Sequence, residues 1–428
     1  MKHIAITIFI SLGTACAWAQ VPIPNCEGAR FLNPVFSGVD VSTVVYGQNY
    51  TNTGNLQTLR MDIYRPRNDS FNRRPVIVWA YGGSFTAGIR QSPDIVRLSQ
   101  EFARRGYVCV SIDYRLGVDN NGTKEETRLN AVQAVSRGVH DMRAAVRWLR
   151  KSFVESDNPY GVDTAQIFAG GVSAGGFIAS HLLYMDAAWK ILEFADTTGF
   201  YSAWGGLEGN SGNPGYHSGI KGAINLCGAL GNAAWIDPGD PFIISMHGDQ
   251  DGTVPYAHDE VTVYGRVGLF VDGSYVMDSV AKARGVNSYF YTYRNMDHVP
   301  FVSLDVGQIL QNGIINEPVM GITVDFIAEK LFNHLDCNTL GYVPTEIVSR
   351  TGGISNAIEI YPHPVRDRLV VRRSGEAKPT PLTIFNVLGQ TALETVLYSP
   401  TEEIPLSLSP GLYFVRAGNL TVKRITVE

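Results

Sequence analysis

The chain has 428 residues, of which 45% are hydrophobic and 18% charged, a globular balance that excludes wholesale disorder. Its formal net charge of −5 is too small to indicate nucleic acid or a membrane surface as a partner. The five cysteines are too few for a disulfide scaffold and lack the paired Cys/His spacing of a zinc site, so we expect no bound metal. Length alone allows one to three domains.

Residues 1–19 have the pattern of a secretory signal peptide. A basic start precedes the apolar run 4–12, and Ala-Trp-Ala at 17–19 forms a small-x-small cleavage site. A lipidation box ending at Cys16 is the alternative, but Gly13 stands where a larger aliphatic residue is expected. We therefore predict cleavage after Ala19 and export of the mature chain.

Export makes disulfides possible among the four cysteines that remain. Cys109 and Cys227 lie within apolar, strand-like runs, which predicts that both are buried free thiols. Cys26 and Cys337 lie in polar surroundings near the two ends of residues 20–340. We predict a bridge between these two residues.

Short apolar runs alternate with helical patterns through the middle of the chain. The expected strands are 76–80, 108–112, 167–169, 223–226, 242–246 and 289–293. Between the second and third runs, apolar residues from Val132 to Leu149 recur in steps of three and four, which predicts a helix with one apolar stripe. Such alternation is typical of an α/β fold, with a mostly parallel sheet flanked by helices.

Residues 171–175 read Gly-Val-Ser-Ala-Gly and lie between an expected strand and an expected helix. A strand-to-helix turn this tight leaves no room for flanking side chains and places the Ser173 hydroxyl above a helix N-terminus. We therefore predict Ser173 as a nucleophile; the alternative is a purely structural turn.

A serine nucleophile needs a base, and the base needs an orienting acid; in this arrangement their chain order is Ser, acid, His. The loop after 242–246 offers Asp249 and Asp251. We favour Asp251, which lies deeper in the loop, and assign Asp249 to capping the loop. A calcium loop is disfavoured because the distal Glu is missing.

His298 is the one histidine that follows the acid in a loop after an expected strand, so we predict it as the base. His258 comes too soon after Asp251 and is expected to open a helix. Asp297 remains a rival partner for His298.

Tyr-Gly-Gly-Ser-Phe at 81–85 follows the expected strand 76–80. Glycines there can turn backbone amides toward the serine, so we predict an oxyanion hole formed by the N–H groups of Gly83, Ser84 and Ala174. The alternative is a simple tight turn.

These sequence motifs resemble those of the α/β-hydrolase esterase superfamily, and the resemblance covers about residues 50–335. The motif at 81–85 matches the His/Tyr-Gly-Gly-Gly motif of carboxylesterases, with Ser84 in place of the last Gly. Ser-Ala-Gly-Gly at 173–176 is shared by carboxylesterases and hormone-sensitive-lipase-like esterases. The motif at 247–255 is similar to one found in secreted acetyl and feruloyl esterases that act on plant polysaccharide. The resemblance implies ester hydrolysis without a cofactor.

The segment 186–220 is rich in glycine and aromatic residues and precedes the strand expected at 223–226. We predict that it forms a cap over the site, the alternative being a packed surface loop. Substrate contacts are expected from Tyr81, Phe85 and Trp204.

The pattern changes after residue 340, through a linker at 341–353, to short alternating strands within 354–428 that predict a small β-sandwich. Three motifs, at 361–369, 384–390 and 408–416, resemble those of the C-terminal sorting domain of the type IX secretion system of Bacteroidetes-like bacteria. The resemblance implies passage through the periplasm and outer membrane, with the secretion machinery as a partner and a secreted or surface-attached product.

The sequence as a whole predicts a secreted, monomeric serine carboxylesterase in residues 20–340. Its expected substrates are small esters or acetyl and feruloyl esters linked to polysaccharide. A serine peptidase of the same fold and a non-catalytic surface protein are the alternatives. The stretch from Gln20 to Tyr81 is too short for the upstream propeller of prolyl-oligopeptidase-like peptidases, which disfavours the peptidase.

Overall fold

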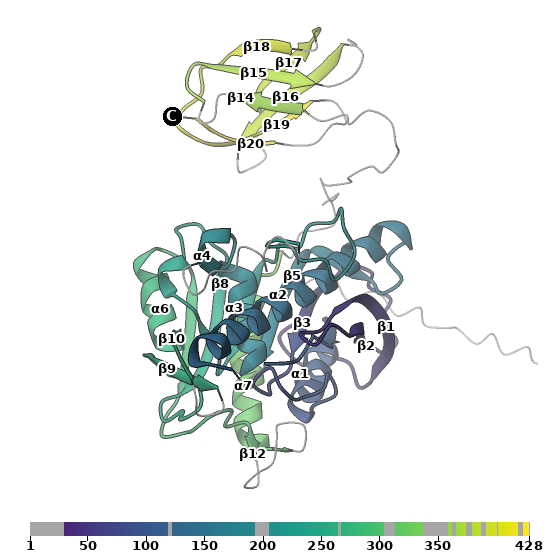
Figure 1. Ribbon diagram of the computed structural model, residues 1–428. Coiled ribbons are helices and arrows are strands. Elements are labelled where there is room, and N and C mark those ends of the chain that lie inside the picture. Colours follow the sequence, from purple (N-terminus) through teal and green to yellow (C-terminus); the bar gives the residue numbers. More distant parts are fainter. Residues whose placement is uncertain are drawn as a thin grey trace, which may run out of the picture. The chain divides into compact units, whose positions relative to one another are not determined.

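The computed structural model describes the chain in two compact units, Met1–Asn338 and Thr339–Glu428 (Figure 1). The described residues are 30–118, 122–192, 205–263, 267–303, 313–336, 358–361, 365–373, 379–386, 391–399, 401–417 and 423–427. The predicted signal peptide, the linker, Cys26, Cys337 and Trp204 lie outside them.

An eight-stranded sheet is the centre of the first unit. In spatial order its strands are β1 (Val39–Tyr50), β2 (Leu56–Pro66), β4 (Val108–Ile112), β3 (Arg74–Ala80), β5 (Val162–Val172), β6 (Gly222–Leu226), β8 (Phe242–Gly248) and β11 (Ser288–Tyr293). From β4 to β11 every neighbouring pair is parallel, and β1 and β2 are antiparallel additions. The predicted mostly parallel α/β fold is confirmed.

The central strands are apolar throughout because both faces of the sheet are covered. Every residue of β3, β4, β6 and β8 is buried, which is why the sequence shows continuous apolar runs rather than alternation. Each expected strand coincides with an observed one; β4 has the expected bounds, and the other observed strands extend further at one or both ends.

Helices flank this sheet. They are α1 (Pro93–Arg104), α2 (Lys124–Glu155), α3 (Ala174–Tyr184), α4 (Ala188–Leu192), α6 (Ser274–Ala283) and α7 (Glu317–Phe332), with a 3₁₀ turn η1 at Ala233–Trp235. Helix α2 begins with a capping box, in which Thr123 accepts a hydrogen bond from the Glu126 amide and the Glu126 carboxylate accepts one from the Thr123 amide. The residues of its predicted apolar stripe differ in burial: Val139 is fully buried, whereas Val132 and Val135 are only partly buried.

The first unit also contains a smaller, separate sheet, which the sequence did not predict. It comprises β7 (Ala229–Leu230), β10 (Val267–Gly273) and β9 (His258–Val263), with a further two-stranded pair of β12 (Val302–Ser303) and β13 (Ile314–Ile315). The helix expected at His258 is therefore wrong. His258 begins a strand, and its Nδ1 lies 2.7 Å from Oδ1 of Asp272 on the opposite strand.

The second unit has two antiparallel sheets around its own core, in keeping with the predicted β-sandwich. One sheet contains β14 (Ile358–Tyr361), β15 (Arg368–Arg373) and β18 (Thr401–Pro405). The other contains β17 (Thr391–Leu397), β16 (Thr380–Asn386), β19 (Gly411–Ala417) and β20 (Lys423–Val427). Alternate side chains such as Leu382, Ile384 and Val415 are fully buried between the strands.

Four loops of the first unit leave the same edge of the main sheet, because they follow the carboxyl ends of the parallel strands β3, β5, β8 and β11. Ligand sites of open α/β sheets occupy this edge. None of the helices in the described part of the chain combines the length and the apolar composition that a membrane span requires.

Candidate active site

Ser173 occupies a strained turn between β5 and α3. Its φ of 55° and ψ of −117° are unusual for a residue with a side chain, and such strain is common at functional sites. A Cβ on Gly171 would lie 2.0 Å from the Gly175 carbonyl oxygen, and one on Gly175 would lie 2.0 Å from the Ala80 oxygen. The two glycines are therefore required by close backbone approach, as the sequence predicts.

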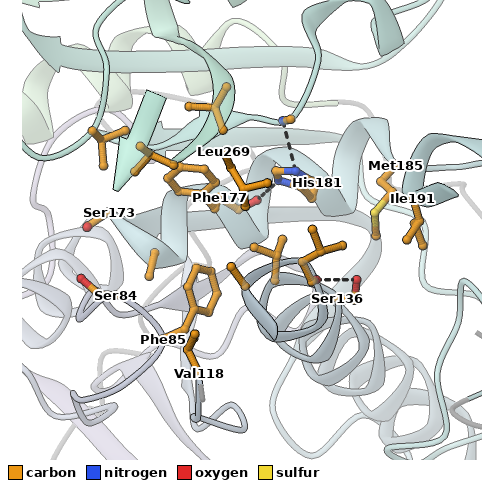
Figure 2. A pocket seen from close by; sticks show the side chains of 18 of the residues that line it. Ser84, Phe85, Val118, Ser136, Ser173, Phe177, His181, Met185, Ile191 and Leu269 are labelled. Carbon is orange, nitrogen blue, oxygen red and sulfur yellow. Dashed lines mark hydrogen bonds between the residues drawn. The ribbon is translucent and has the colours of Figure 1, made fainter. Parts of the chain in front are cut away.

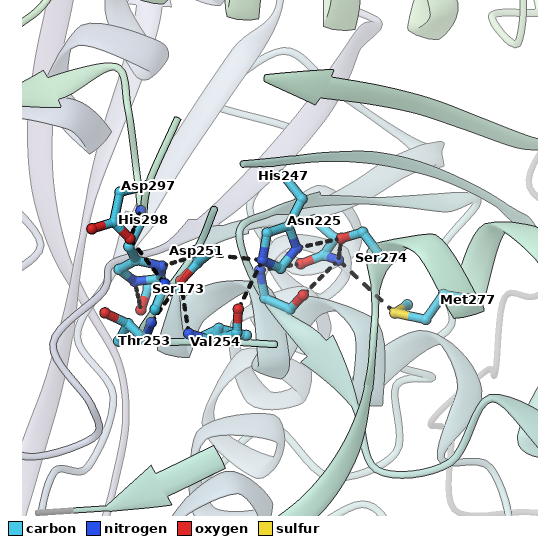
Figure 3. A network of polar contacts seen from close by, with 12 residues as sticks. Ser173, Asn225, His247, Asp251, Thr253, Val254, Ser274, Met277, Asp297 and His298 are labelled. Atoms are coloured by element: carbon cyan, nitrogen blue, oxygen red, sulfur yellow. Dashed lines mark hydrogen bonds and ion pairs between the residues drawn. The ribbon is translucent and has the colours of Figure 1, made fainter. Parts of the chain in front are cut away.

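Two hydrogen bonds connect Ser173 to a histidine and a carboxylate (Figure 3). Ser173 Oγ lies 2.9 Å from His298 Nε2, and His298 Nδ1 lies 2.7 Å from Asp251 Oδ2. With the hydroxyl donating to Nε2 and the Nδ1–H donating to the carboxylate, the neutral ring has the tautomer that a general base needs. The three residues predicted for these roles lie together, on the loops after β5, β8 and β11.

Asp251 is held as an anion although its side chain is fully buried. Burial acts to raise the pKa of this carboxyl, but hydrogen bonds from His247 and His298 outweigh it and lower the pKa well below its usual range. Its Oδ1 also accepts hydrogen bonds of 2.8 Å from the backbone N–H groups of Thr253 and Val254. The orientation of the carboxylate is thereby fixed.

His247 is a part of this network that the sequence argument missed. Its Nε2 lies 3.0 Å from Asp251 Oδ2, and its Nδ1 lies 2.9 Å from Ser274 Oγ. Asn225 donates to the same Ser274 oxygen at 3.1 Å, so the Ser274 hydroxyl is free to donate to Nδ1. The Nε2–H then has two acceptors, Asp251 Oδ2 and the Val254 carbonyl oxygen at 3.1 Å. No spacing rule pointed to it, because His247 lies in β8 and Asp251 in the loop that follows.

The rival carboxylates have other partners. Asp249 accepts a hydrogen bond from the Asn295 amide at 2.7 Å, and Asp297 accepts one from the Gly252 amide at 2.9 Å. These contacts join the loop after β8 to the loop after β11, which places His298 against Asp251. Both residues position the loops, and neither ring nitrogen of His298 is bonded to them.

The turn after β3 brings backbone amides near Ser173. Gly83 has a φ of 132°, and a Cβ there would lie 2.2 Å from the Ala87 carbonyl oxygen. Ser84 lines the same cavity as Ser173 and Ala174, and Gly83 comes directly before it in the turn. Ala174 is the first residue of α3, and the N–H groups of a helix's first turn have no partner within the helix.

A cavity of about 220 Å³ extends from Ser173 into the first unit (Figure 2). Phe85 and Val118 lie near one end, and Met185 and Ile191 lie at the other. Most of its wall is apolar, and α2, α3 and the strands β9 and β10 contribute to it.

The cavity wall differs from two of the predictions about substrate contacts, those for Tyr81 and for the cap at 186–220. Tyr81 is 2% exposed and its ring stacks on Tyr114 at 4.4 Å, so it supports the turn after β3 and is not part of the described wall. Of the predicted cap at 186–220, only Lys190 and Ile191 among the described residues line the cavity. Its described part at 205–220 is bound to α2 through Glu208.

The two predicted free cysteines are confirmed, since Cys109 and Cys227 are buried thiols. Burial raises the pKa of both. The sulfur of Cys227 lies with Asp251 and His298, and possible ligand atoms of the three are within 4.8 Å of one another. Because a metal-binding cysteine must lose its proton and the carboxylate and ring are bonded to each other, we assign no metal to this group.

Comparisons with known proteins agree with the two-part organisation. Residues 61–196 match the family model described as BD-FAE, and residues 359–428 match that of the secretion system C-terminal sorting domain. Carboxylesterase 3B of Mus musculus is 33% identical over 38% of this chain and 28% of its own length. Secreted lipase 5 of Gibberella zeae is 31% identical over 37% and 28%, respectively. The chain thus spans less than a third of the length of these relatives.

Among solved structures, a propionate-bound esterase of Thermogutta terrifontis aligns with 69% of this chain and 96% of its own, at 21% identity and a TM-score of 0.45. Fumonisin B1 esterase of Sphingopyxis macrogoltabida is 28% identical over 29% of this chain and 22% of its own length. The chain therefore joins an α/β-hydrolase domain related to carboxylesterases and lipases to a type IX secretion sorting domain, and it is secreted or held at the cell surface.

Proposed function

We propose that the α/β-hydrolase domain is a serine carboxylesterase. The observation that carries this proposal is the continuous hydrogen-bonded series from Ser173 through His298 to Asp251, with the serine in a strained turn at the mouth of an apolar cavity. The esterases and lipases among the relatives support the same reaction class.

In the proposed first half-reaction, Ser173 Oγ attacks the ester carbonyl carbon while its proton passes to His298 Nε2. The negative charge that develops on the carbonyl oxygen is met by the N–H groups of Ala174, Gly83 and Ser84, and one such donor is typically worth about 2.7–4 kcal/mol of barrier. When the tetrahedral intermediate collapses, His298 gives the proton to the departing alcohol. An acyl ester on Ser173 remains.

In the second half-reaction, water attacks the acyl carbon and gives a proton to His298 Nε2. Collapse returns that proton to Ser173 and releases the carboxylic acid. Asp251 stays ionised throughout and stabilises the protonated ring, which is why its lowered pKa suits the role. His247 holds that carboxylate from the other side, so we propose it as a positioning residue.

The test compares p-nitrophenyl butyrate with an aminoacyl p-nitroanilide. We expect turnover of the ester alone, abolished by Ser173→Ala and unaffected by Ser156→Ala, an exposed serine that follows α2. Turnover of the anilide instead would indicate a serine peptidase. Full ester turnover by Ser173→Ala would contradict the proposed mechanism.

For the second unit, we propose that the type IX machinery recognises residues 359–428 during export. Deleting this range is expected to keep the esterase inside the producing cell, whereas the full chain reaches the surface or the medium. Equal export of both forms would contradict the proposal.

A further inference from the structure

The cavity beside Ser173 has a polar mouth and an apolar interior. The exposed residues of its wall include the polar Ser84, Thr253 and Thr262. Deeper in, the wall is formed by side chains such as Val135, Phe177 and Leu269. In Figure 2 the labelled residues follow one another from Ser173 and Ser84 at one end to Met185 and Ile191 at the other.

Lys190 brings a buried charge to this wall but offers nothing to a ligand. Its Nζ donates to the carbonyl oxygens of Tyr184 and Trp235, both at 2.9 Å, and forms an ion pair with Asp186 at 2.6 Å. These three contacts use all three of its donors. The cavity receives the side of its aliphatic stem.

His181 is also fully engaged. Its Nδ1 donates to the Phe177 carbonyl oxygen at 2.8 Å, and its Nε2 accepts a hydrogen bond from the Gly231 amide at 3.2 Å. Burial lowers the pKa of His181 to about 4, so the ring is neutral at physiological pH. Ser136 likewise donates to the Val132 carbonyl oxygen at 2.9 Å. None of these three side chains has a hydrogen left to donate to a ligand, and only the Ser136 oxygen keeps lone pairs that could accept one.

The position of His298 indicates which part of an ester, the acyl group or the alcohol, occupies the cavity. The leaving alcohol takes its proton from His298 Nε2 and must lie on that side of Ser173. His298 is not part of the described cavity wall, whereas Ala174 and Ser84, on the side of the proposed oxyanion donors, are. The half that stays on the serine, the acyl group, therefore faces the cavity.

The size of the cavity sets the length of that group. An apolar protein cavity of about 150 Å³ holds benzene, with its six carbons, so a cavity of about 220 Å³ holds about nine carbons in proportion. An acetyl group would leave most of it empty.

We propose, resting on the esterase function above, that this cavity binds unsubstituted aliphatic acyl chains of about six to ten carbons. It selects against acetyl groups because they bury little apolar surface. It selects against hydroxylated aromatic acyl groups such as feruloyl because Lys190, His181 and Ser136 offer no free donor, and burying a hydroxyl that loses hydrogen bonds to water is costly.

The first test measures kcat/KM for p-nitrophenyl esters from acetate to dodecanoate, below their micelle concentrations. We expect a rise of about fourfold per methylene beyond butyrate, from the free energy of burying one CH₂. The maximum should fall near octanoate, with a decline for dodecanoate. A maximum at acetate would overturn the proposal, while Ser173-dependent hydrolysis of acetate would leave the esterase function standing.

Two further substrate series test the assignment. A matched series of alkyl acetates should show no comparable rise; a rise there instead would place the alcohol in the cavity and overturn the acyl assignment. The p-nitrophenyl ester of 3-phenylpropanoate should exceed that of its 4-hydroxyphenyl analogue by about tenfold or more. Equal rates would overturn the inference that the interior lacks a free hydrogen-bond donor.

Variants of helix α2 test the location. Val135→Phe should shorten the cavity, lowering kcat/KM for octanoate at least tenfold relative to acetate and moving the maximum to shorter chains. Val154→Phe is the matched control on the same helix, since Val154 is 48% exposed and not part of the wall. If Val135→Phe misfolds, the chain-length profile of Ile191→Ala, expected to shift toward longer chains, gives the same information. Profiles unchanged in both variants would overturn the proposal.

Discussion

Two regions meet at Ser173 and use their buried polar groups in opposite ways. On one side, His298, Asp251, His247 and Ser274 bond to one another, so that each orients the next toward the serine (Figure 3). On the other side, the buried polar side chains of the cavity wall, His181 and Lys190, are bonded to the surrounding protein, and the ligand meets mostly apolar surface (Figure 2). The polar region should govern the rate of proton transfer, and the apolar region should govern which ester is used.

The largest expected effect comes from the acid. Asp251→Asn should lower kcat by about 10⁴-fold, because an amide in its place favours the wrong tautomer of the histidine. Asp249→Asn is the matched control: its carboxylate bonds only the loop after β11, so kcat should change less than tenfold. Steady-state kinetics with p-nitrophenyl butyrate measure both. Similar losses in the two variants would mean that loop position, rather than Asp251, controls the rate.

Changing His247 separates the two regions more finely. His247→Phe removes the hydrogen bond to Asp251 while preserving much of the ring volume, and we expect kcat to fall about 10- to 100-fold, the effect of losing about 1.4–2.7 kcal/mol of transition-state stabilisation. His247→Gln retains a donor and should restore part of the loss. The ratio of octanoate to acetate hydrolysis should stay constant in both. A changed ratio would show that the polar region also shapes the cavity.

The same hydrogen bond should give the stability a defined pH dependence. Because the folded-state pKa of Asp251 is lowered, its contribution is fully present above the unfolded pKa of about 3.9 and is lost as the pH falls through the folded value. His247→Phe should therefore cost about 1.5–3 kcal/mol of unfolding free energy at neutral pH and less below about pH 4. Urea unfolding at several pH values measures this, and a pH-independent difference would contradict it.

The smallest effects separate two neighbouring aromatic residues. Phe85 lies in the cavity wall, so Phe85→Leu should lower kcat/KM for octanoate several-fold more than for acetate. Tyr81→Phe keeps the stacking on Tyr114 outside that wall and should leave both rates within about twofold. The full acyl-ester profile of each variant is the measurement. Equal changes in the two profiles would contradict the described boundary of the cavity.

The sequence predicted the main sheet because its central strands are buried on both faces and thus appear as continuous apolar runs. It also predicted the turn at Ser173, where close backbone approach requires glycine on either side. Strands with one exposed face were harder: β1 and β9 alternate or carry charges, and their partners are set by tertiary contacts. That is why His258 was expected to open a helix.

The polar site was predicted in part. Chain order and loop position were enough to choose Ser173, Asp251 and His298. Chain order also excluded His247, because a base was sought after the acid; its contact with Asp251 arises from the loop turning back after β8. The cavity was missed because its wall combines α2, α3 and β10, which are distant in sequence.

The most direct test of the central claim is covalent labelling with a fluorophosphonate, followed by mass spectrometry of the peptides. We predict one label per chain, on Ser173, with loss of ester hydrolysis in proportion to labelling and with much slower labelling of His298→Ala. A chain that hydrolyses esters while Ser173 stays unlabelled, or that carries the inactivating label on another residue, would contradict the claim.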